Sequence, residues 1–141
     1  MIVGYTSGVY DLFHVGHLNI LKRAKSQCDR LIVAVTTDEL SSSRKGKKPV
    51  IPFEERFAIV SELRCVDEVV PQKDMDKFGA WERHHFHRMF VGDDWKGHPK
   101  WVELEERFAP HGVDIVYFPY TTHTSSTKLR EVLDVMTSGG A

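Results

Sequence analysis

Two histidines near the start of the chain, His14 and His17, enclose Gly16 in the order His-x-Gly-His, directly before a helical apolar pattern. Residues three apart lie on one face of a helix, and Gly16 has no side chain to keep a ligand from the backbone. The first turn of a helix carries unpaired N–H groups and partial positive charge, which favour a phosphate. Two imidazoles there can donate hydrogen bonds to phosphate oxygens as negative charge grows on them. The spacing therefore predicts a site for phosphate chemistry.

This pattern is rare by chance. The chain has 8 His and 10 Gly among 141 residues, so a random His-x-Gly-His is expected about 0.03 times. The competing interpretation is a helix-capping turn whose two histidines are satisfied by local hydrogen bonds. The position of the pattern, after an apolar run at the start of the chain, favours the phosphate site.

Apolar runs alternate with helical patterns along the chain, and these elements must position the histidines. Met1–Tyr5 form the first apolar run, which Thr6-Ser7-Gly8 is expected to interrupt, and Leu18, Leu21 and Ala24 mark the first helical face. Further strands are expected over residues 30–36, 66–71, 89–92 and 113–118, and further helices over residues 53–63, 75–87, 100–108 and 126–136. This alternation predicts an α/β fold with one domain, a Rossmann-like, doubly wound sheet of five parallel strands.

The single domain is expected to span residues 1–136, with a frayed tail over residues 137–141. Residues 37–52 are polar and basic and are expected to form a loop. In doubly wound sheets, ligands bind beyond the carboxyl ends of the strands. His14 and His17 follow the first strand, so they are expected at that edge.

The basic run Arg44–Lys48 lies in this polar segment, with Gly46 at its centre. Taken alone, it is best explained as a solvated basic loop. Together with the histidine pattern, it favours a mobile clamp on a triphosphate, in which lysines neutralise negative charge and Gly46 lets the loop close.

Four motifs together resemble a known superfamily. They are Gly8-x-Tyr10-Asp11-x-x-His14-x-Gly16-His17, Arg64-Cys65-Val66-Asp67-Glu68-Val69-Val70-Pro71, Val91-Gly92-Asp93-Asp94-Trp95-Lys96-Gly97 and Ser125-Ser126-Thr127-Lys128. Their order and spacing are similar to those of the HxGH nucleotidyltransferase superfamily, in its cytidylyltransferase branch, and the likeness to glycerol-3-phosphate cytidylyltransferases extends over nearly the whole chain. The resemblance implies the fold of that superfamily and transfer of CMP from CTP to a small phosphate- or phosphonate-bearing acceptor, with release of pyrophosphate.

The resemblance also implies roles for individual residues. The catalytic residues are His14, His17, Lys45 and Lys47. The nucleotide-binding residues are Gly8, Val9, Tyr10, Gly16, Asp94, Thr124, Ser125, Ser126 and Thr127. The acceptor-binding residues are Asp11, Arg56, Arg64, Asp67, Tyr120 and His123, with Asp67 orienting Arg64. Mg²⁺ bound with CTP is the implied cofactor, assisted by Asp11.

Some of these residues have simpler interpretations. Arg56 is equally well explained as a surface arginine paired with Glu55 or Glu62. Asp94 fits a turn with a solvated carboxylate. The hydroxyl groups of residues 124–127 are good N-caps for a helix, which accounts for one of them.

The chain departs from its relatives at one motif. They usually read Arg-Thr-Glu-Gly-Ile-Ser-Thr-Thr where this chain has residues 120–127, so Tyr120 replaces an arginine that helps to hold the nucleotide or the acceptor. His123 is expected to replace part of the lost charge. The departure slightly favours another acceptor, such as a phosphonate of the phosphonoformate type. ATP in place of CTP also stays open, because the HxGH pattern alone does not choose the base. A catalytically silent nucleotide-binding protein is a further alternative, which the intact histidines and lysines disfavour.

Composition limits the remaining classes of function. The formal net charge of −1 disfavours a nucleic-acid partner. Cys28 and Cys65 are isolated and are expected to be reduced thiols. No leader and no apolar run long enough to span a bilayer is apparent, so no membrane association and a cytoplasmic location are expected. The histidine cluster over residues 84–87 has no Cys or carboxylate to complete a metal site, so it fits a solvated helix face. The resemblance implies a homodimer.

Overall fold

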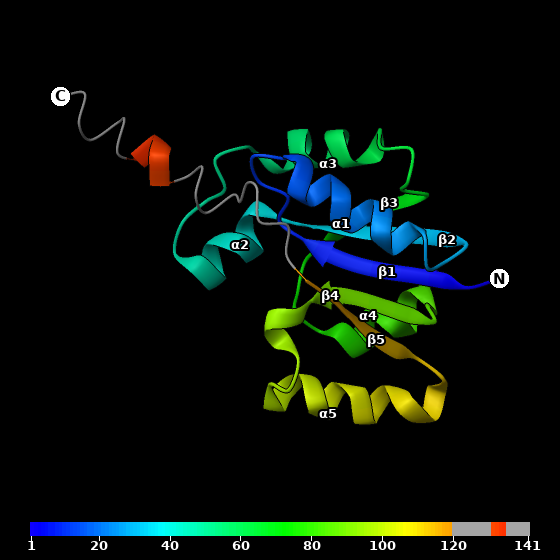
Figure 1. Cartoon of the computed structure of the whole chain (residues 1–141). Helices are drawn as coiled ribbons and strands as arrows, with labels where there is room; N and C mark the ends of the chain where they lie inside the picture. The colour runs from blue at the N-terminus through cyan, green and yellow to red at the C-terminus, as the bar shows by residue number, and fades with distance from the viewer. Residues whose placement is uncertain (120–130, 135–141) are drawn as a thin grey trace.

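The computed structural model describes residues 1–119 and 131–134 (Figure 1). Predictions for Tyr120, His123 and residues 124–127, and for the tail, lie outside the described residues. So does most of the closing helix expected over residues 126–136, of which residues 131–134 are helical.

Within the described residues, five parallel strands form one sheet in the order β3-β2-β1-β4-β5. The strands are β1 (Val3–Gly8), β2 (Arg30–Thr36), β3 (Glu68–Gln72), β4 (Arg88–Gly92) and β5 (Asp114–Phe118). The predicted Rossmann-like parallel sheet is therefore confirmed. The strand order reverses between β1 and β4, and this switch point is where such sheets bind ligands.

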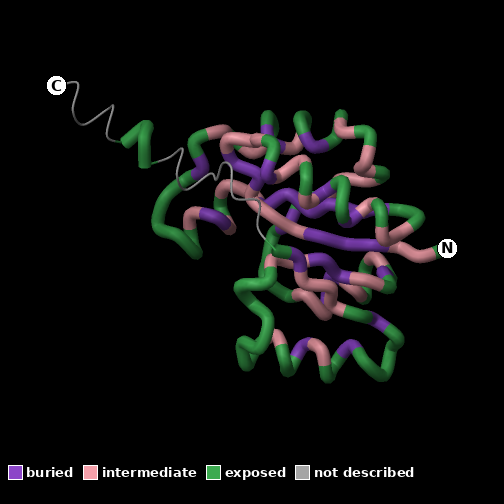
Figure 2. Tube along the Cα trace, in the orientation of Figure 1, coloured by how far each residue is buried: buried purple, intermediate pink, exposed green. Residues whose placement is uncertain are grey.

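Helices cover both faces of the sheet (Figure 1). One face carries α1 (Val15–Lys25) and α3 (Phe53–Ser61), and the other carries α4 (Lys77–His84) and α5 (Pro99–Phe108), with α2 (Asp38–Lys45) beyond the carboxyl ends. Successive residues of β2 point to opposite faces, so Val33 packs with Leu21 and Val60 while Ile32 packs with Phe108. Figure 2 shows the buried residues along the central strands and on the helix sides that face them. No helix in the described ranges is long and apolar enough to cross a bilayer.

Strand β1 runs through Thr6 and Ser7 to Gly8, so the expected interruption of the strand was wrong. Thr6 is buried, and its hydroxyl donates a hydrogen bond to the carbonyl oxygen of Phe90 at 2.9 Å. This bond satisfies the buried polar group and allows it to stay in the strand. The longer strand carries Ser7 and Gly8 to the carboxyl edge of the sheet.

The polar segment after β2 contains a helix where a loop was expected. The hydroxyl of Thr37 caps α2 by accepting from the N–H of Leu40 at 3.2 Å, and Asp38 and Glu39 occupy the first turn. The helix ends at Gly46, whose φ of 73° is readily adopted by glycine. Capping and turn residues therefore stabilise a helix in this segment, although the segment contains few apolar residues.

Arg56 on α3 is 1% exposed and joins four segments of the chain. Its guanidinium group donates to the carbonyl oxygens of Ile51 (2.8 Å), Val9 (2.7 Å) and Thr36 (2.7 Å). It also forms a 2.7 Å salt bridge with Asp38. The predicted contact between Arg56 and the acceptor was wrong, because its N–H groups are used inside the protein. The alternative of a surface arginine paired with Glu55 or Glu62 was wrong as well.

We expect Arg56→Met to lower the free energy of unfolding by about 3–5 kcal/mol, because it leaves the Asp38 carboxylate and three carbonyl oxygens without their donor. The measurement is urea denaturation. Arg64→Met, an exposed arginine that follows the same helix, is the matched control and should change the value by no more than about 0.5 kcal/mol. Equal effects of the two variants would contradict the role given to Arg56.

Candidate active site

The site is built on the loop between β1 and α1. Tyr10 and Leu12 in this loop have φ values of 56° and 51°, a left-handed conformation that costs energy for residues other than glycine. Asp11 lies between them, and its carboxylate accepts hydrogen bonds from the backbone N–H groups of Val50 (2.8 Å) and Ile51 (2.9 Å). Together with the bond from Arg56 to Val9, these contacts hold the strained loop in place.

Asp11 is 2% exposed. The carboxylate lies inside the protein against the segment before α3, and the predicted contact between Asp11 and the acceptor stays a prediction. It is a positioning residue for the loop that carries the histidines. Its suggested part in holding Mg²⁺ stays a prediction.

His14 and His17 cap α1 reciprocally. His14 Nδ1 accepts from the N–H of Gly16 at 3.0 Å, and His17 Nδ1 accepts from the N–H of His14 at 3.1 Å. Their rings lie 4.1 Å apart between centroids. Because Nδ1 is an acceptor in each ring, the proton of the neutral imidazole lies on Nε2. The capping interpretation is thus confirmed. The capping hydrogen bonds also determine that Nε2 is the nitrogen of each ring that can donate to a phosphate.

Both imidazoles are held in the neutral form. Burial lowers the pKa of His14 below its usual value. Burial, reinforced by the neighbouring His14 ring and opposed by Asp11, lowers the pKa of His17 to about 4. At neutral pH each ring is therefore an N–H donor rather than a cation.

Aromatic residues of the same loop fix the orientation of His17. Its ring packs edge-on against Tyr10 at 5.6 Å and tilted against Phe13 at 5.1 Å. Tyr10 is buried and lies directly against Gly8, where a Cβ atom would come within 2.9 Å of the Tyr10 ring. Gly8 is therefore required for close packing, and Tyr10 supports His17 from inside.

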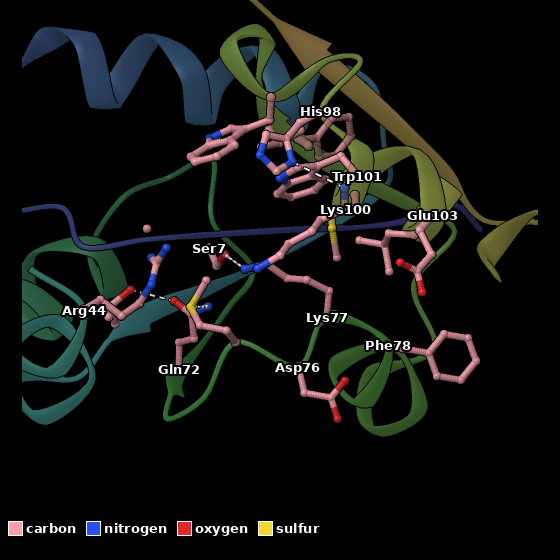
Figure 3. A pocket seen from close by; sticks show the side chains of 18 of the residues that line it. Ser7, Arg44, Gln72, Asp76, Lys77, Phe78, His98, Lys100, Trp101 and Glu103 are labelled. Carbon is pink, nitrogen blue, oxygen red and sulfur yellow. Dashed lines mark hydrogen bonds between the residues drawn. The ribbon is translucent and has the colours of Figure 1, made fainter. Parts of the chain in front are cut away.

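A cavity of about 660 Å³ opens at the carboxyl ends of the strands, on the side of α4 and α5 (Figure 3). Of the predicted site residues, Gly8, Val9 and Lys45 line it. Its other cationic side chains are Arg44, Lys77, Lys100 and Arg107. Two acidic residues, Asp76 and Glu103, line it as well, so its five cationic side chains outnumber the acidic ones, which favours an anionic ligand.

Several predicted site residues lie outside this cavity lining. Gly16 is buried in the first turn of α1, whereas Lys47 and Asp94 are exposed. Asp94 belongs to the short 3-10 helix η1 (Asp93–Trp95), whose last residue, Trp95, does line the cavity. Lys77 and Trp101 also line it and were not predicted. No sequence pattern marks either residue, because α4 and α5 meet β1 only in the folded chain.

Arg64 and Asp67 are at the opposite edge of the sheet. Both precede β3, so they lie at the amino ends of the parallel strands, away from His14. Asp67 forms a 2.7 Å salt bridge with Lys25 and accepts from the N–H of Leu31, and Arg64 is exposed. Within one chain these two residues lie far from the histidines, and their predicted acceptor contacts stay a prediction.

The described residues hold no group of three His, Cys, Asp or Glu side chains that could bind a metal ion. Mg²⁺ is commonly bound through the phosphates of a nucleotide and one or two carboxylates rather than by a complete protein cage. Mg²⁺ bound with CTP stays a prediction.

We expect the His17 ring to stay neutral from pH 8 down to about pH 5 and to titrate with a midpoint of about 4. The measurement is the ¹⁵N chemical shift of its two ring nitrogens as a function of pH. In urea the same ring should titrate at about 6.5, the value for an unperturbed histidine. A midpoint at or above 6.5 in the folded protein would contradict the burial and contacts described here.

Comparison with known proteins shows the family to which the chain belongs. The sequence profile of the family described as "Cytidylyltransferase-like" matches residues 5–132. The glycerol-3-phosphate cytidylyltransferase of Bacillus subtilis (strain 168) is 37% identical over 133 residues, covering 89% of this chain and 92% of that protein. The enzyme of the same name from Staphylococcus aureus is 34% identical over 129 residues, covering 91% of this chain and 92% of its own length.

Among solved structures, the lipopolysaccharide core biosynthesis protein from Thermoplasma volcanium matches with a TM-score of 0.71 and 27% identity. The match covers 88% of this chain and 99% of that protein. The sequence and structural comparisons thus agree with the α/β fold and its parallel sheet. The chain belongs to the cytidylyltransferase-like family and is a nucleotidyltransferase.

Proposed function

We propose that the protein transfers CMP from CTP to a small acceptor that carries a phosphate or phosphonate group, with release of pyrophosphate. The observation that carries this proposal is the pair of neutral imidazoles at the start of α1, each with its proton on Nε2. The loop before α1 joins them to β1, whose last residues line the cavity, while neither histidine is among its lining residues. Family membership supports CTP as the nucleotide.

In the proposed reaction an acceptor oxygen attacks the α-phosphorus of CTP. A bond forms between this oxygen and phosphorus while the bond from phosphorus to the bridging oxygen breaks, and pyrophosphate leaves with the electron pair. The Nε2–H groups of His14 and His17 donate to the α-phosphate and the bridging oxygen as their negative charge grows. Since the Nδ1 atoms are held by backbone N–H groups, the donors are oriented before the nucleotide binds.

Lys45 and Lys47 neutralise the departing pyrophosphate in this proposal. Lys45 is the last residue of α2 and lines the cavity, and Gly46 separates it from Lys47. Because Asp38 at the start of α2 is paired with Arg56, the helix is fixed at one end while its basic end faces the cavity. The loop after Gly46 is then free to bring Lys47 to the same phosphates. Mg²⁺ is proposed to accompany the triphosphate and to neutralise part of its charge.

Glycerol 3-phosphate is the first acceptor to test, because the relatives that match over most of their length are named for it. The replacement of the family's arginine by Tyr120 changes the cations available to an acceptor. A phosphonate such as phosphonoformate is therefore the second candidate.

The proposal is tested by measuring pyrophosphate release from CTP and Mg²⁺ with a panel of small phosphates and phosphonates. We expect release with CTP and at least one acceptor, at a rate that depends on the acceptor. ATP serves as the nucleotide control. Release only with ATP would assign an adenylyltransferase, and CTP binding without release for any acceptor would leave a nucleotide-binding protein.

We expect His17→Ala to lower kcat about a hundredfold or more, the usual effect of removing one oriented donor at a transition state. The measurement is the same pyrophosphate assay at saturating substrates. His111→Gln, which changes an exposed histidine of the segment before β5, is the control and should retain the wild-type kcat. A His17→Ala variant with near wild-type kcat would remove His17 from the reaction.

A further inference from the structure

Two polar side chains are buried at the carboxyl ends of β2 and β3. Thr36 is the last residue of β2 and is 5% exposed, and Gln72 is the last residue of β3 and is 7% exposed. The two residues are register partners in the sheet, and both line the cavity. Figure 3 shows the Gln72 side chain among those that surround the cavity. Neither residue has a part in the cytidylyl transfer described above.

A side-chain hydrogen bond sets the orientation of the Gln72 amide. The Thr36 hydroxyl donates to Gln72 Oε1 at 2.6 Å, so the amide nitrogen is turned away from Thr36. There Nε2 lies 3.7 Å from the sulfur atom of Met75. A thioether sulfur can accept a hydrogen bond but has none to donate, so it favours the nitrogen of the amide over the oxygen as its neighbour. The amide therefore directs its two N–H groups away from β2.

These two N–H groups lack a strong acceptor. One faces the Met75 sulfur, which accepts only weakly, and the other has no partner among the described residues. The pair is not needed to join the strands, because the N–H of Thr37 already donates to the carbonyl oxygen of Gln72 at 3.1 Å. A buried amide donor without an acceptor is unfavourable, and a ligand oxygen that enters the cavity would satisfy it.

The backbone around this pair is fixed relative to the loop that carries the histidines. Arg56 donates to the carbonyl oxygens of Val9 and Thr36, each at 2.7 Å, so the ends of β1 and β2 are held side by side. Gln72 pairs with Thr36 on the next strand. It therefore lies at the same edge of the sheet as the histidine loop, two strands away from β1.

The amide is neutral, and this determines which group of a ligand it suits. Charged groups of the substrates have the cationic side chains of the cavity as partners. An amide N–H pairs well with an uncharged oxygen, such as that of a hydroxyl group. A buried donor also discriminates against an analogue that lacks the matching oxygen, because the donor is then left unpaired. Gln72 is thus suited to select a hydroxylated ligand.

The position of Gln72 favours the acceptor as that ligand. In the proposed reaction the nucleotide is bound by the histidines, and Asp94, its predicted contact, follows β4. Gln72 is at the end of β3, on the other side of β1 in the sheet. An acceptor that approaches the α-phosphorus from this side would carry its uncharged part past Gln72.

We propose that Gln72, oriented by Thr36, donates a hydrogen bond to a hydroxyl oxygen of the acceptor and makes the enzyme prefer hydroxylated acceptors to analogues without the hydroxyl. The inference rests on the proposed cytidylyl transfer and adds a specificity-determining residue to it. Thr36 acts through the amide and is a positioning residue.

The test measures kcat/KM for two matched pairs of acceptors in the pyrophosphate assay. Glycerol 3-phosphate is paired with propyl phosphate, and 2-hydroxyethylphosphonate with ethylphosphonate, so the second member of each pair lacks only hydroxyl groups. We expect wild type to prefer the hydroxylated member of at least one pair by about tenfold or more, the effect of one hydrogen bond to a buried donor. Gln72→Met should remove most of this preference. It should leave kcat/KM for the member without hydroxyl groups, and KM for CTP, within about twofold of wild type.

Thr36→Val tests the positioning role, because it keeps the shape of the side chain and removes the hydroxyl that orients the amide. It should lower the preference by a smaller factor, about threefold. Thr6→Val is the matched control, since Thr6 is also a buried, hydrogen-bonded strand hydroxyl but does not line the cavity. It should leave the preference unchanged.

Wild-type preference in Gln72→Met, or an equal fall in kcat/KM for both members of a pair, would overturn the assignment while leaving the proposed function intact. The same holds if wild type does not prefer the hydroxylated member of either pair, or if only KM for CTP rises in the variant. Wild type that releases no pyrophosphate with any acceptor would overturn the proposed function, and this inference with it. If Gln72→Met does not fold, Gln72→Glu supplies the same comparison, because its carboxylate accepts from Thr36 but donates no hydrogen bond.

Discussion

The buried guanidinium group of Arg56 is the interaction on which the site depends most. It joins the loop after β1, the end of β2, the start of α2 and the segment before α3 through one set of hydrogen bonds. Asp11 adds two bonds between the first and last of these segments. Each segment contains, or is next to, a residue that is proposed to contact a substrate. The site is therefore arranged by long-range polar contacts at the carboxyl edge, above an apolar core that forms the sheet.

The histidine pair shows how one local motif can stabilise the fold and provide the chemistry. In each ring Nδ1 satisfies a backbone N–H at the start of α1, so that the other nitrogen holds the proton. Packing against Tyr10 and Phe13 fixes the orientation of the His17 ring and buries it, and burial lowers its pKa so that it stays neutral. A helix start capped by serine or aspartate would be similarly stable, but it would not place two N–H donors side by side.

The features that sequence analysis could predict are those that depend on local patterns. Apolar periodicity was enough for the parallel sheet, and the spacing of His14, Gly16 and His17 was enough to place both histidines at the start of α1. Arg56 and Lys77 could not be assigned in this way, because burial of the first and the cavity position of the second arise from contacts between distant segments. Arg64 differs, because its place before β3 puts it at the amino ends of the parallel strands, and this follows from the order of the elements.

The central claim is that both imidazoles donate from Nε2 to the phosphates of a bound nucleotide. It is tested most directly by ¹⁵N NMR of histidine-labelled protein, with Mg²⁺ and a CTP analogue that cannot be cleaved between its α- and β-phosphates. We expect the Nε2 signals of His14 and His17 to shift on binding while both Nε2 atoms remain protonated and both Nδ1 atoms stay hydrogen-bond acceptors. Saturation with the analogue without any change at either ring would contradict it.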